Sequence, residues 1–280
     1  MPTPPKSARR RALLWGVPAL LLTAATAALT VTRSEDTSPR PITAAEAQHL
    51  ALARFSRFEA SPADVEIHIP MRDMTLTVRG VVDYRSHRGV GHFTDGKTGG
   101  LVAWDGGGLA VATGLPKNAP PGGRGGSDGK APSTKRRVLS LDDAATLPYT
   151  SWSPRAYTTD PLDTMLKLTM LLGQDRPENA QLLAQSGPRW LGSQEIDGAT
   201  YGVFSAPRPA TPKGKKAPIR KPGDSPLRLF VSDDGRLGRV TTQLPSQSQL
   251  GVIDFHADKV SRKVPEQPWN RQPVVGGGKQ

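Results

Sequence analysis

The sequence predicts an α+β domain in which a mostly antiparallel sheet packs on a few helices. Period-two alternation recurs along the chain, as in Val65 to Ile69, where apolar residues alternate with Glu66 and His68. Two Asp-Gly pairs, at 197–198 and 234–235, stand between apolar runs and are strong hairpin signals. Helix starts are marked at two other places. This mixture of paired strands and separate helices is typical of the α+β class.

Three helices are expected. Thr43 and Glu46 have the spacing of a capping box, which predicts a helix from there to about Phe58. Asp160 followed by Pro161 opens a second helix, and Leu162 to Leu172 is apolar almost all round. A third runs from about Pro177 to Gln185 and ends at Gly187.

The expected strands share alternation, or a short apolar run bounded by turn residues. They cover residues 65–69, 74–78, 82–84, 101–104, 109–113, 189–196, 200–205, 227–232, 236–244 and 250–255.

The N-terminus carries an export signal. Basic residues at 6–11 precede an uncharged run, residues 12–31, that is long enough as a helix to cross one hydrocarbon core. The positive-inside rule leaves residues 1–11 as a cytoplasmic stub, makes 12–31 a single-pass signal-anchor in the cell membrane, and exports the main domain. A cleaved signal peptide, with its apolar core at 13–22 and cleavage after Ala27, is the alternative and would give a secreted protein.

The net charge of +12 is unevenly distributed along the 280 residues. The N-terminal stub and two Pro- and Gly-rich stretches, 116–137 and 208–222, carry +15 together, which leaves −3 for everything else. Neither stretch contains an aromatic residue, whereas a nucleic-acid reader is expected to carry its charge on a structured face. We therefore expect no nucleic-acid partner. The expected organisation is a linker at 32–41, one domain at 42–260 with disordered insertions at 116–137 and 207–226, and a disordered tail at 261–280.

One short motif suggests a nucleotide. Gly91 to Thr98, "GHFTDGKT", fits the phosphate-loop pattern. A working loop of this kind leads into a helix whose N-terminus holds the phosphates. Here Gly99-Gly100 and a strand-like "LVAW" follow, so we interpret the segment as a turn with Asp95-Gly96 at its tip and expect no nucleotide.

No catalytic apparatus, cofactor site or metal site is predicted. Cysteine is absent, which excludes disulfides, thiolate metal sites and cysteine nucleophiles. The five histidines match no ligand spacing, and no Gly-x-Ser-x-Gly elbow is present. The protein is therefore not expected to be an enzyme.

The order of segments resembles the bacterial LolA/LppX-like lipid and lipoprotein carriers, including RseB-like regulatory domains. Three pieces carry the resemblance: "VRGVVDYRSHRGVGHF", "RPENAQLLAQSGPRWLGSQEIDGATYGVF" and "LRLFVSDDGRLGRVTTQL". The chain departs from the family in having no lipid-modified cysteine and in its two basic insertions.

The resemblance implies a strongly curved half-barrel sheet wrapped around helices, with an apolar cavity for acyl chains between them. The apolar helix 162–172 suits such a cavity, although a helix that is simply core has the same pattern. The candidate ligand-lining residues are Met74, Leu76, Val78, Val82, Tyr84, Met165, Leu166 and Met170. The expected partner is a lipid or other amphiphile, and the alternative is a sensory or scaffold domain that binds another envelope protein.

Overall fold

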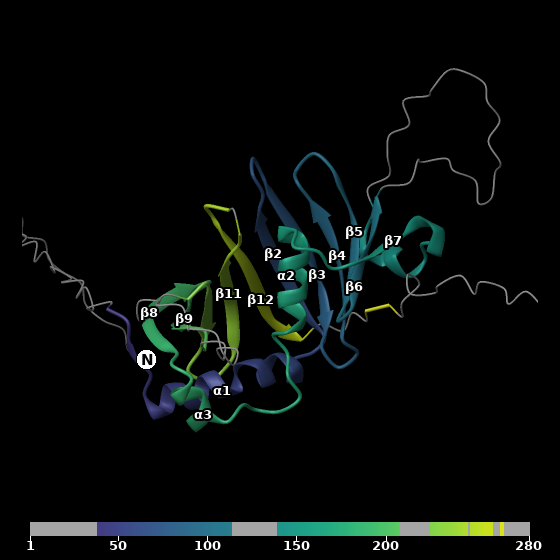
Figure 1. Ribbon diagram of the computed structural model, residues 1–280. Helices are drawn as coiled ribbons and strands as arrows, with labels where there is room; N and C mark the ends of the chain where they lie inside the picture. Colours follow the sequence, from purple (N-terminus) through teal and green to yellow (C-terminus); the bar gives the residue numbers. More distant parts are fainter. Residues whose placement is uncertain (1–37, 114–138, 208–224, 246, 260–263, 266–280) are drawn as a thin grey trace, which may run out of the picture. The chain divides into compact units, whose positions relative to one another are not determined.

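A computed structural model describes residues 38–113, 139–207, 225–245, 247–259 and 264–265. Within these ranges, twelve strands form one open, curved antiparallel sheet in the order β1-β8-β9-β10-β11-β12-β2-β3-β4-β5-β6-β7 (Figure 1). The sheet and its helices confirm the α+β class. The strands are β1 (Arg40–Pro41), β2 (Ala63–Pro70), β3 (Thr75–Asp83), β4 (Arg88–Thr94), β5 (Gly99–Asp105), β6 (Gly108–Thr113), β7 (Ser153–Ala156), β8 (Arg189–Ile196), β9 (Ala199–Ser205), β10 (Leu227–Val231), β11 (Leu237–Gln243) and β12 (Leu250–Lys259).

Two antiparallel meanders lie side by side in this sheet. Strands β2 to β7 follow one another, as do β8 to β12, and β12 pairs with β2 to join the two halves. The register places Ile253 opposite Ile67 and Asp254 opposite Glu66. Because opposite residues share a face, the apolar side chains of both strands lie on one side of the sheet and the acidic ones on the other.

The described residues form three α-helices: α1 (Ala44–Glu59), α2 (Pro161–Met170) and α3 (Ala180–Gln185). The predicted capping box is present, because Thr43 Oγ1 accepts a hydrogen bond from Glu46 N at 3.2 Å and Glu46 Oε2 accepts one from Thr43 N at 2.7 Å. Gly187 follows α3 with a φ of +83°, as expected for a residue that ends a helix. None of these helices combines the length and the hydropathy needed to span a bilayer.

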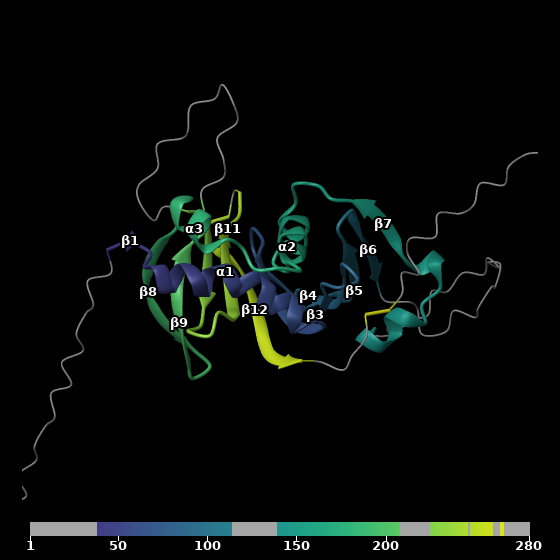
Figure 2. The same ribbon diagram turned by 90° about the horizontal axis from the view of Figure 1, so that it is seen from below.

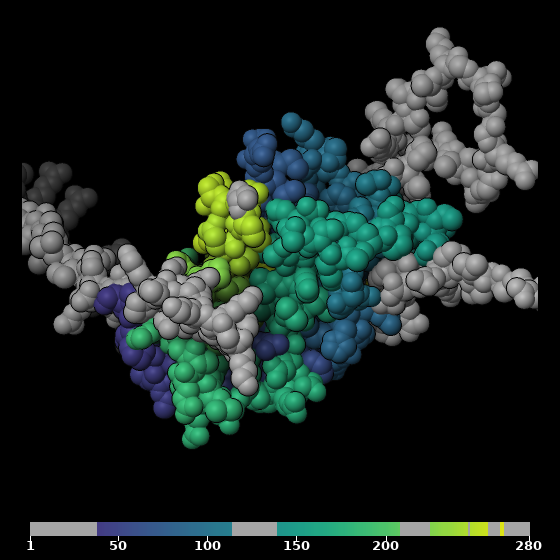
Figure 3. Space-filling view, in the orientation of Figure 1, coloured from purple at the N-terminus to yellow at the C-terminus, as the bar shows by residue number. Residues whose placement is uncertain are grey.

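The helices lie on the concave face of the sheet, where the main core forms (Figure 2). α1 runs across one end of the strands and α2 packs over the middle of the sheet. In Figure 3, teal atoms cover the middle of this side, where Figure 1 places α2. Val65, Ile67 and Val78 from the sheet meet Met165 and Leu166 from α2 in this core, and all five are buried.

A second, smaller core covers part of the opposite face. Val90, Leu101 and Ala103 point away from the α-helices and pack against residues 139–152, which form two short 3₁₀ helices. Trp152 is buried in this cluster. The β4–β6 part of the sheet is therefore covered by apolar contacts on both faces.

The structure corrects several predicted strands. Residues 74–78 and 82–84 were expected as separate strands, but β3 runs without a break from Thr75 to Asp83, with Met74 just before it and Tyr84 just after it. Gly80 lies opposite Gly91 of β4, and a Cβ atom at Gly80 would stand 2.2 Å from the Val90 oxygen, so the glycine allows the close pairing. β4 and the short edge strands β1 and β7 were not predicted.

The phosphate-loop match comprises the end of β4 and the hairpin turn that connects β4 to β5. Asp95 Oδ1 accepts hydrogen bonds from the amides of Lys97, at 2.7 Å, and Thr98, at 2.5 Å. β5 begins at Gly99, directly after the motif, so no helix starts where a phosphate loop requires one. The interpretation as a turn is confirmed.

The remaining sequence predictions on chain organisation lie outside the described residues. These are the stub and signal-anchor at 1–31, the insertion at 116–137, nearly all of the insertion at 207–226, and nearly all of the tail at 261–280.

Candidate functional site: an apolar cavity among the helices

The described part of the chain contains an apolar cavity of about 390 Å³. It lies where α1, α2 and α3 meet the strands β10 and β11. Its lining is aliphatic except for one charged pair, and consists of Leu50, Ala53, Arg54, Leu168, Leu171, Leu172, Glu178, Leu183, Ala206, Pro207, Leu227, Leu229 and Leu237.

The link between α2 and α3 forms one wall of the cavity and is tied to α1 by its backbone. Gln174 N donates to the Arg54 oxygen at 3.2 Å, and Glu178 N donates to the Ala51 oxygen at 3.0 Å. Asn179 then caps α3, because its Oδ1 accepts from the amides of Gln181 and Leu182. Leu172, at the start of the link, and Leu183, in α3 beyond it, both line the cavity.

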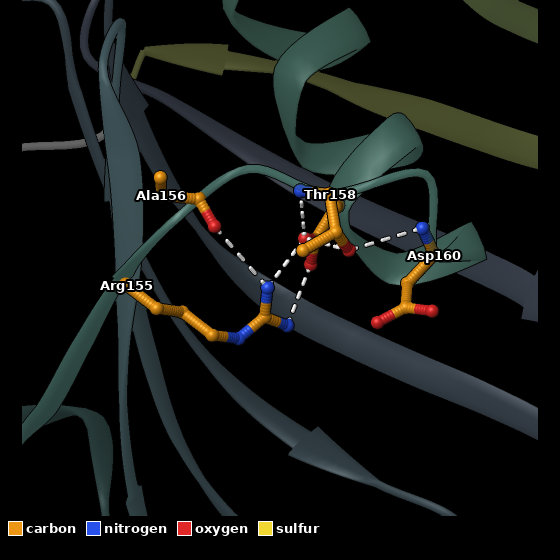
Figure 4. Close-up of polar contacts among 5 residues, drawn as sticks. Arg155, Ala156, Thr158 and Asp160 are labelled. Carbon is orange, nitrogen blue, oxygen red and sulfur yellow. Dashed lines mark hydrogen bonds and ion pairs between the residues drawn. The ribbon is translucent and has the colours of Figure 1, made fainter.

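The start of α2 is held by a buried ion pair. The Asp163 carboxylate, which is fully buried, accepts two hydrogen bonds from the Arg155 guanidinium (Figure 4). It also accepts from Thr158 N at 2.6 Å and from Thr158 Oγ1 at 2.7 Å. Burial alone would raise the pKa of Asp163, but the bonds from Arg155 and Thr158 outweigh it and hold that pKa below its ordinary value. The pair therefore fastens the first turn of α2 to β7.

The end of α2 is held by Tyr84, next to β3. The Tyr84 hydroxyl donates to the Thr169 oxygen at 3.1 Å, and both residues are buried. Gly173 passes directly over the ring, since a Cβ atom there would stand 2.3 Å from ring carbons of Tyr84. Burial raises the pKa of Tyr84 well above its ordinary value, so the hydroxyl stays protonated and remains a donor. With both ends of α2 fixed, Leu168 in the helix and Leu171 and Leu172 directly after it line the cavity.

A single ion pair supplies the charge at the cavity wall. Arg54 Nη1 lies 3.0 Å from Glu178 Oε1, and both side chains are part-exposed. A cavity with this lining has one chemical capability: it can remove an apolar chain from water and leave a polar group beside Arg54 and Glu178.

The residues predicted to line a ligand site lie elsewhere. Leu76, Val78, Val82, Tyr84, Met165, Leu166 and Met170 belong to the main core and are buried. Met74 lies outside β3 with 45% of its surface exposed. None of the eight lines the cavity. The sheet and the middle of α2 pack against each other directly, and the open space lies one turn further along, at the end of α2.

Sequence reasoning found only the α2 side of this cavity. Leu168, Leu171 and Leu172 belong to the apolar helix that was predicted, but nothing in their spacing separates them from core residues. The sequence did contain one signal, because a helix that is apolar on more than one face has more apolar residues than a single sheet contact can bury. In the structure, Leu171 is the residue of this segment that remains 56% exposed. The contributions of α1, α3, β10 and β11 depend on tertiary packing.

A second pocket, of about 430 Å³, lies on the opposite face of the sheet and is polar. It is lined by Asp64, Val65, Glu66, Arg79, Gly80, His92, Leu141 and His256. Arg79 donates to Glu66 at 2.8 Å, which lowers the pKa of that carboxyl. Among the described residues, no three histidine, aspartate or glutamate side chains are grouped so that they could hold a metal ion.

Fold and site together define an α+β protein with an apolar cavity between its helices and a curved antiparallel sheet. No protein-family model matches the chain, and a search of curated proteins found no match.

Proposed function

We propose that this protein binds or carries a lipid or another amphiphile in the apolar cavity, as a non-enzymatic domain held outside the cytoplasm by the predicted N-terminal anchor. The observation that carries the proposal is the cavity itself, lined by leucines from α1, α2 and α3 and from strands β10 and β11. Its volume of about 390 Å³ falls in the range of about 300–1,000 Å³ that is usual for small-molecule sites.

The physical support is the free energy of removing an acyl chain from water, about 0.8 kcal/mol per buried methylene before the costs of binding. The ion pair of Arg54 and Glu178 lies at the wall of this aliphatic space. An amphiphile matches this arrangement better than a wholly apolar or a wholly polar ligand, because it has a group for each environment.

The test is displacement of a fluorescent fatty-acid probe from the purified full chain. Affinity is expected to rise with acyl length until the cavity is full. Ala206, which lines the cavity, offers a filling variant: Ala206→Phe places a ring in the space without adding charge. It is expected to weaken probe binding at least about tenfold, since a filled site excludes the chain.

Ala199→Phe is the matched control. Ala199 is exposed at the other end of β9 and does not line the cavity, so this variant should bind the probe like the unaltered chain. Absence of probe binding by the unaltered chain, or equal binding by folded Ala206→Phe, would contradict the proposal.

One observation favours a second function, that of a domain which docks on another envelope protein. Leu171 and Leu182 are exposed by 56% and 64%, and exposed apolar side chains are typical of interaction surfaces. Under this alternative the cavity stays empty and these leucines contact a protein. Loss of partner capture in Leu182→Gln, with the fatty-acid probe never bound, would support it.

A further inference from the structure

Arg54, at the wall of the apolar cavity, has more hydrogen-bond donors than its partners use. Its Nη1 donates to Glu178 Oε1 at 3.0 Å, and this is the one side-chain hydrogen bond that Arg54 makes among the described residues. Its Nε is buried and has no partner there. A buried donor without an acceptor is costly and uncommon in folded proteins. At a cavity wall, such a donor indicates that a ligand supplies the acceptor.

The free donors of Arg54 have the geometry of a site for an oxyanion. Nε and Nη2 lie on one edge of the planar guanidinium, and Nη1, which bonds to Glu178, is not part of that edge. Two N–H groups on one edge donate side by side to two oxygens of a carboxylate or a phosphate. Because 36% of the Arg54 side chain is exposed, a headgroup bound there reaches water while its chain enters the cavity.

The charge on this face of α1 is positive on balance. Arg57 lies one turn after Arg54, on the same face of the helix, and is 3% exposed. Its charge interacts with Asp234, but Asp234 is itself paired with Arg236 at 2.8 Å. Two guanidiniums of α1 are therefore accompanied by one contacting carboxylate, that of Glu178, and the excess favours an anion over a cation.

We infer that Arg54 makes the cavity selective for a single-chain anionic amphiphile, whose carboxylate or phosphate headgroup it binds through Nε and Nη2. The inference rests on the proposed function, which it narrows from amphiphiles in general to anionic ones. The cavity volume of about 390 Å³ lies near the lower end of the usual range of about 300–1,000 Å³, which favours one acyl chain over a two-chain lipid.

Glu178 is the group to which a cationic headgroup would bind instead. Its carboxylate oxygens are not among the buried atoms that lack a hydrogen-bond partner, so no unsatisfied acceptor in the cavity wall calls for a ligand donor. A cation there would also lie beside the Arg54 guanidinium, 3.0 Å from the same carboxylate. The described groups therefore favour a headgroup that accepts hydrogen bonds and carries negative charge.

The test compares ligands that share one alkyl chain and differ in their headgroup. The neutral dye phenylnaphthylamine, bound to the purified full chain at neutral pH, is displaced by laurate, lauryl phosphate, lauryl alcohol or laurylamine. Ala206→Phe should exclude the dye and so shows that the dye occupies the cavity. Laurate or lauryl phosphate should displace it at a concentration at least about tenfold below that of the alcohol or the amine, as expected for hydrogen bonds to a charged group. The order of these two anions identifies the headgroup.

Arg54→Met should abolish the preference for the anions and leave displacement by lauryl alcohol unchanged. Arg176→Met is the matched control, because Arg176 is exposed in the same link, carries the same charge and does not line the cavity. It should keep the preference. If Arg54→Met fails to fold, Arg54→Lys keeps the charge, removes the paired donors and should lower the preference at least about threefold.

Glu178→Gln gives a test of opposite sign. It removes the negative charge beside the bound headgroup, so it should strengthen laurate binding about threefold and weaken that of laurylamine. Weaker laurate binding in this variant, or a preference of the unaltered chain for laurylamine, would overturn the inference in favour of a cationic ligand.

Equal displacement by laurate, lauryl phosphate and lauryl alcohol would overturn the inference and leave the proposed function intact, because the cavity would then bind chains without reading their headgroup. An anion preference that survives in folded Arg54→Met would overturn it as well, since another group would hold the headgroup. A chain that binds neither the dye nor laurate would contradict the proposed function and, with it, this inference.

Discussion

Replacing Asp163 by asparagine tests whether the buried ion pair holds α2 in place. The substitution keeps the shape of the side chain but removes its charge and turns one acceptor into an NH₂ donor that faces the Arg155 guanidinium. Breaking a buried pair from one side typically costs about 3–5 kcal/mol. Because the Arg155 side chain is 39% exposed and regains water, we expect a loss near the lower end, about 3 kcal/mol.

The assay is equilibrium unfolding by urea, followed by circular dichroism. Asp160→Asn is the matched control, since Asp160 precedes the same helix but its side chain makes no capping hydrogen bond. It should change the free energy of unfolding by less than about 0.5 kcal/mol. A loss below about 1 kcal/mol for Asp163→Asn, or equal losses for the two variants, would refute the reasoning.

The same pair predicts a pH dependence with a definite sign. The pKa of Asp163 is lower in the folded state than its ordinary value of 3.8, so folding favours the ionised carboxylate. Its contribution to stability is therefore complete above about pH 5 and is lost as the pH falls through the folded pKa, below 3.8. Asp163→Asn should flatten the stability profile in this acid range, and a variant profile parallel to that of the unaltered chain would contradict the assignment.

Three further substitutions follow from single contacts. Arg57 is 3% exposed, burial lowers its pKa, and its Nε and Nη1 have no hydrogen-bond partner among the described residues. Arg57→Met should therefore raise the free energy of unfolding by about 1 kcal/mol, although the contact with the Phe255 ring is lost. A loss of stability would point to a partner for the guanidinium. Gly173→Ala should lower it by about 1–3 kcal/mol because the added methyl meets the buried Tyr84 ring, whereas Gly106→Ala, with nothing within 4 Å, should be neutral in the same urea titration. Lys97→Ala should change the free energy of unfolding by no more than about 0.5 kcal/mol. ATP with magnesium should not shift the thermal unfolding of the unaltered chain or of this variant. A shift that Lys97→Ala abolishes would reinstate the nucleotide site.

Much of this fold was predictable because local chemistry specifies it. Asp197 and Gly198 both adopt positive φ, at 51° and 77°, as a two-residue hairpin turn requires, and the β8–β9 pairing follows from them. The box of Thr43 and Glu46 likewise fixes the start of α1 from four residues. In both places a few neighbouring side chains determine the backbone, so no distant part of the chain is needed.

The missed strands lack such local signals. β4 reads "RGVGHFT", where two glycines replace the apolar residues that would alternate, and it is a strand because β3 and β5 supply partners on both sides. β1 and β7 are two and four residues long, and each includes a proline. Short edge strands of this kind form only where a neighbouring strand already provides the hydrogen bonds.

The same contrast between local and tertiary signals explains why none of the candidate residues lines this cavity. An apolar helix that faces a sheet supplies core and cavity lining with the same residue types, and Met165 is no less apolar than Leu168. The two residues differ in how closely a neighbouring element packs against them. Met165 meets the sheet so closely that a Cβ atom at Gly251 would stand 2.6 Å from its sulfur. Beyond it, the link to α3 turns back toward α1, where Gln174 bonds to Arg54, and space opens between the helices. The backbone bonds of the link therefore set the position of the cavity. Met165 is fully buried in the core, so its replacement by aspartate would bury an unpaired charge and should unfold the domain. Leu171 is 56% exposed, so Leu171→Gln should leave the domain folded.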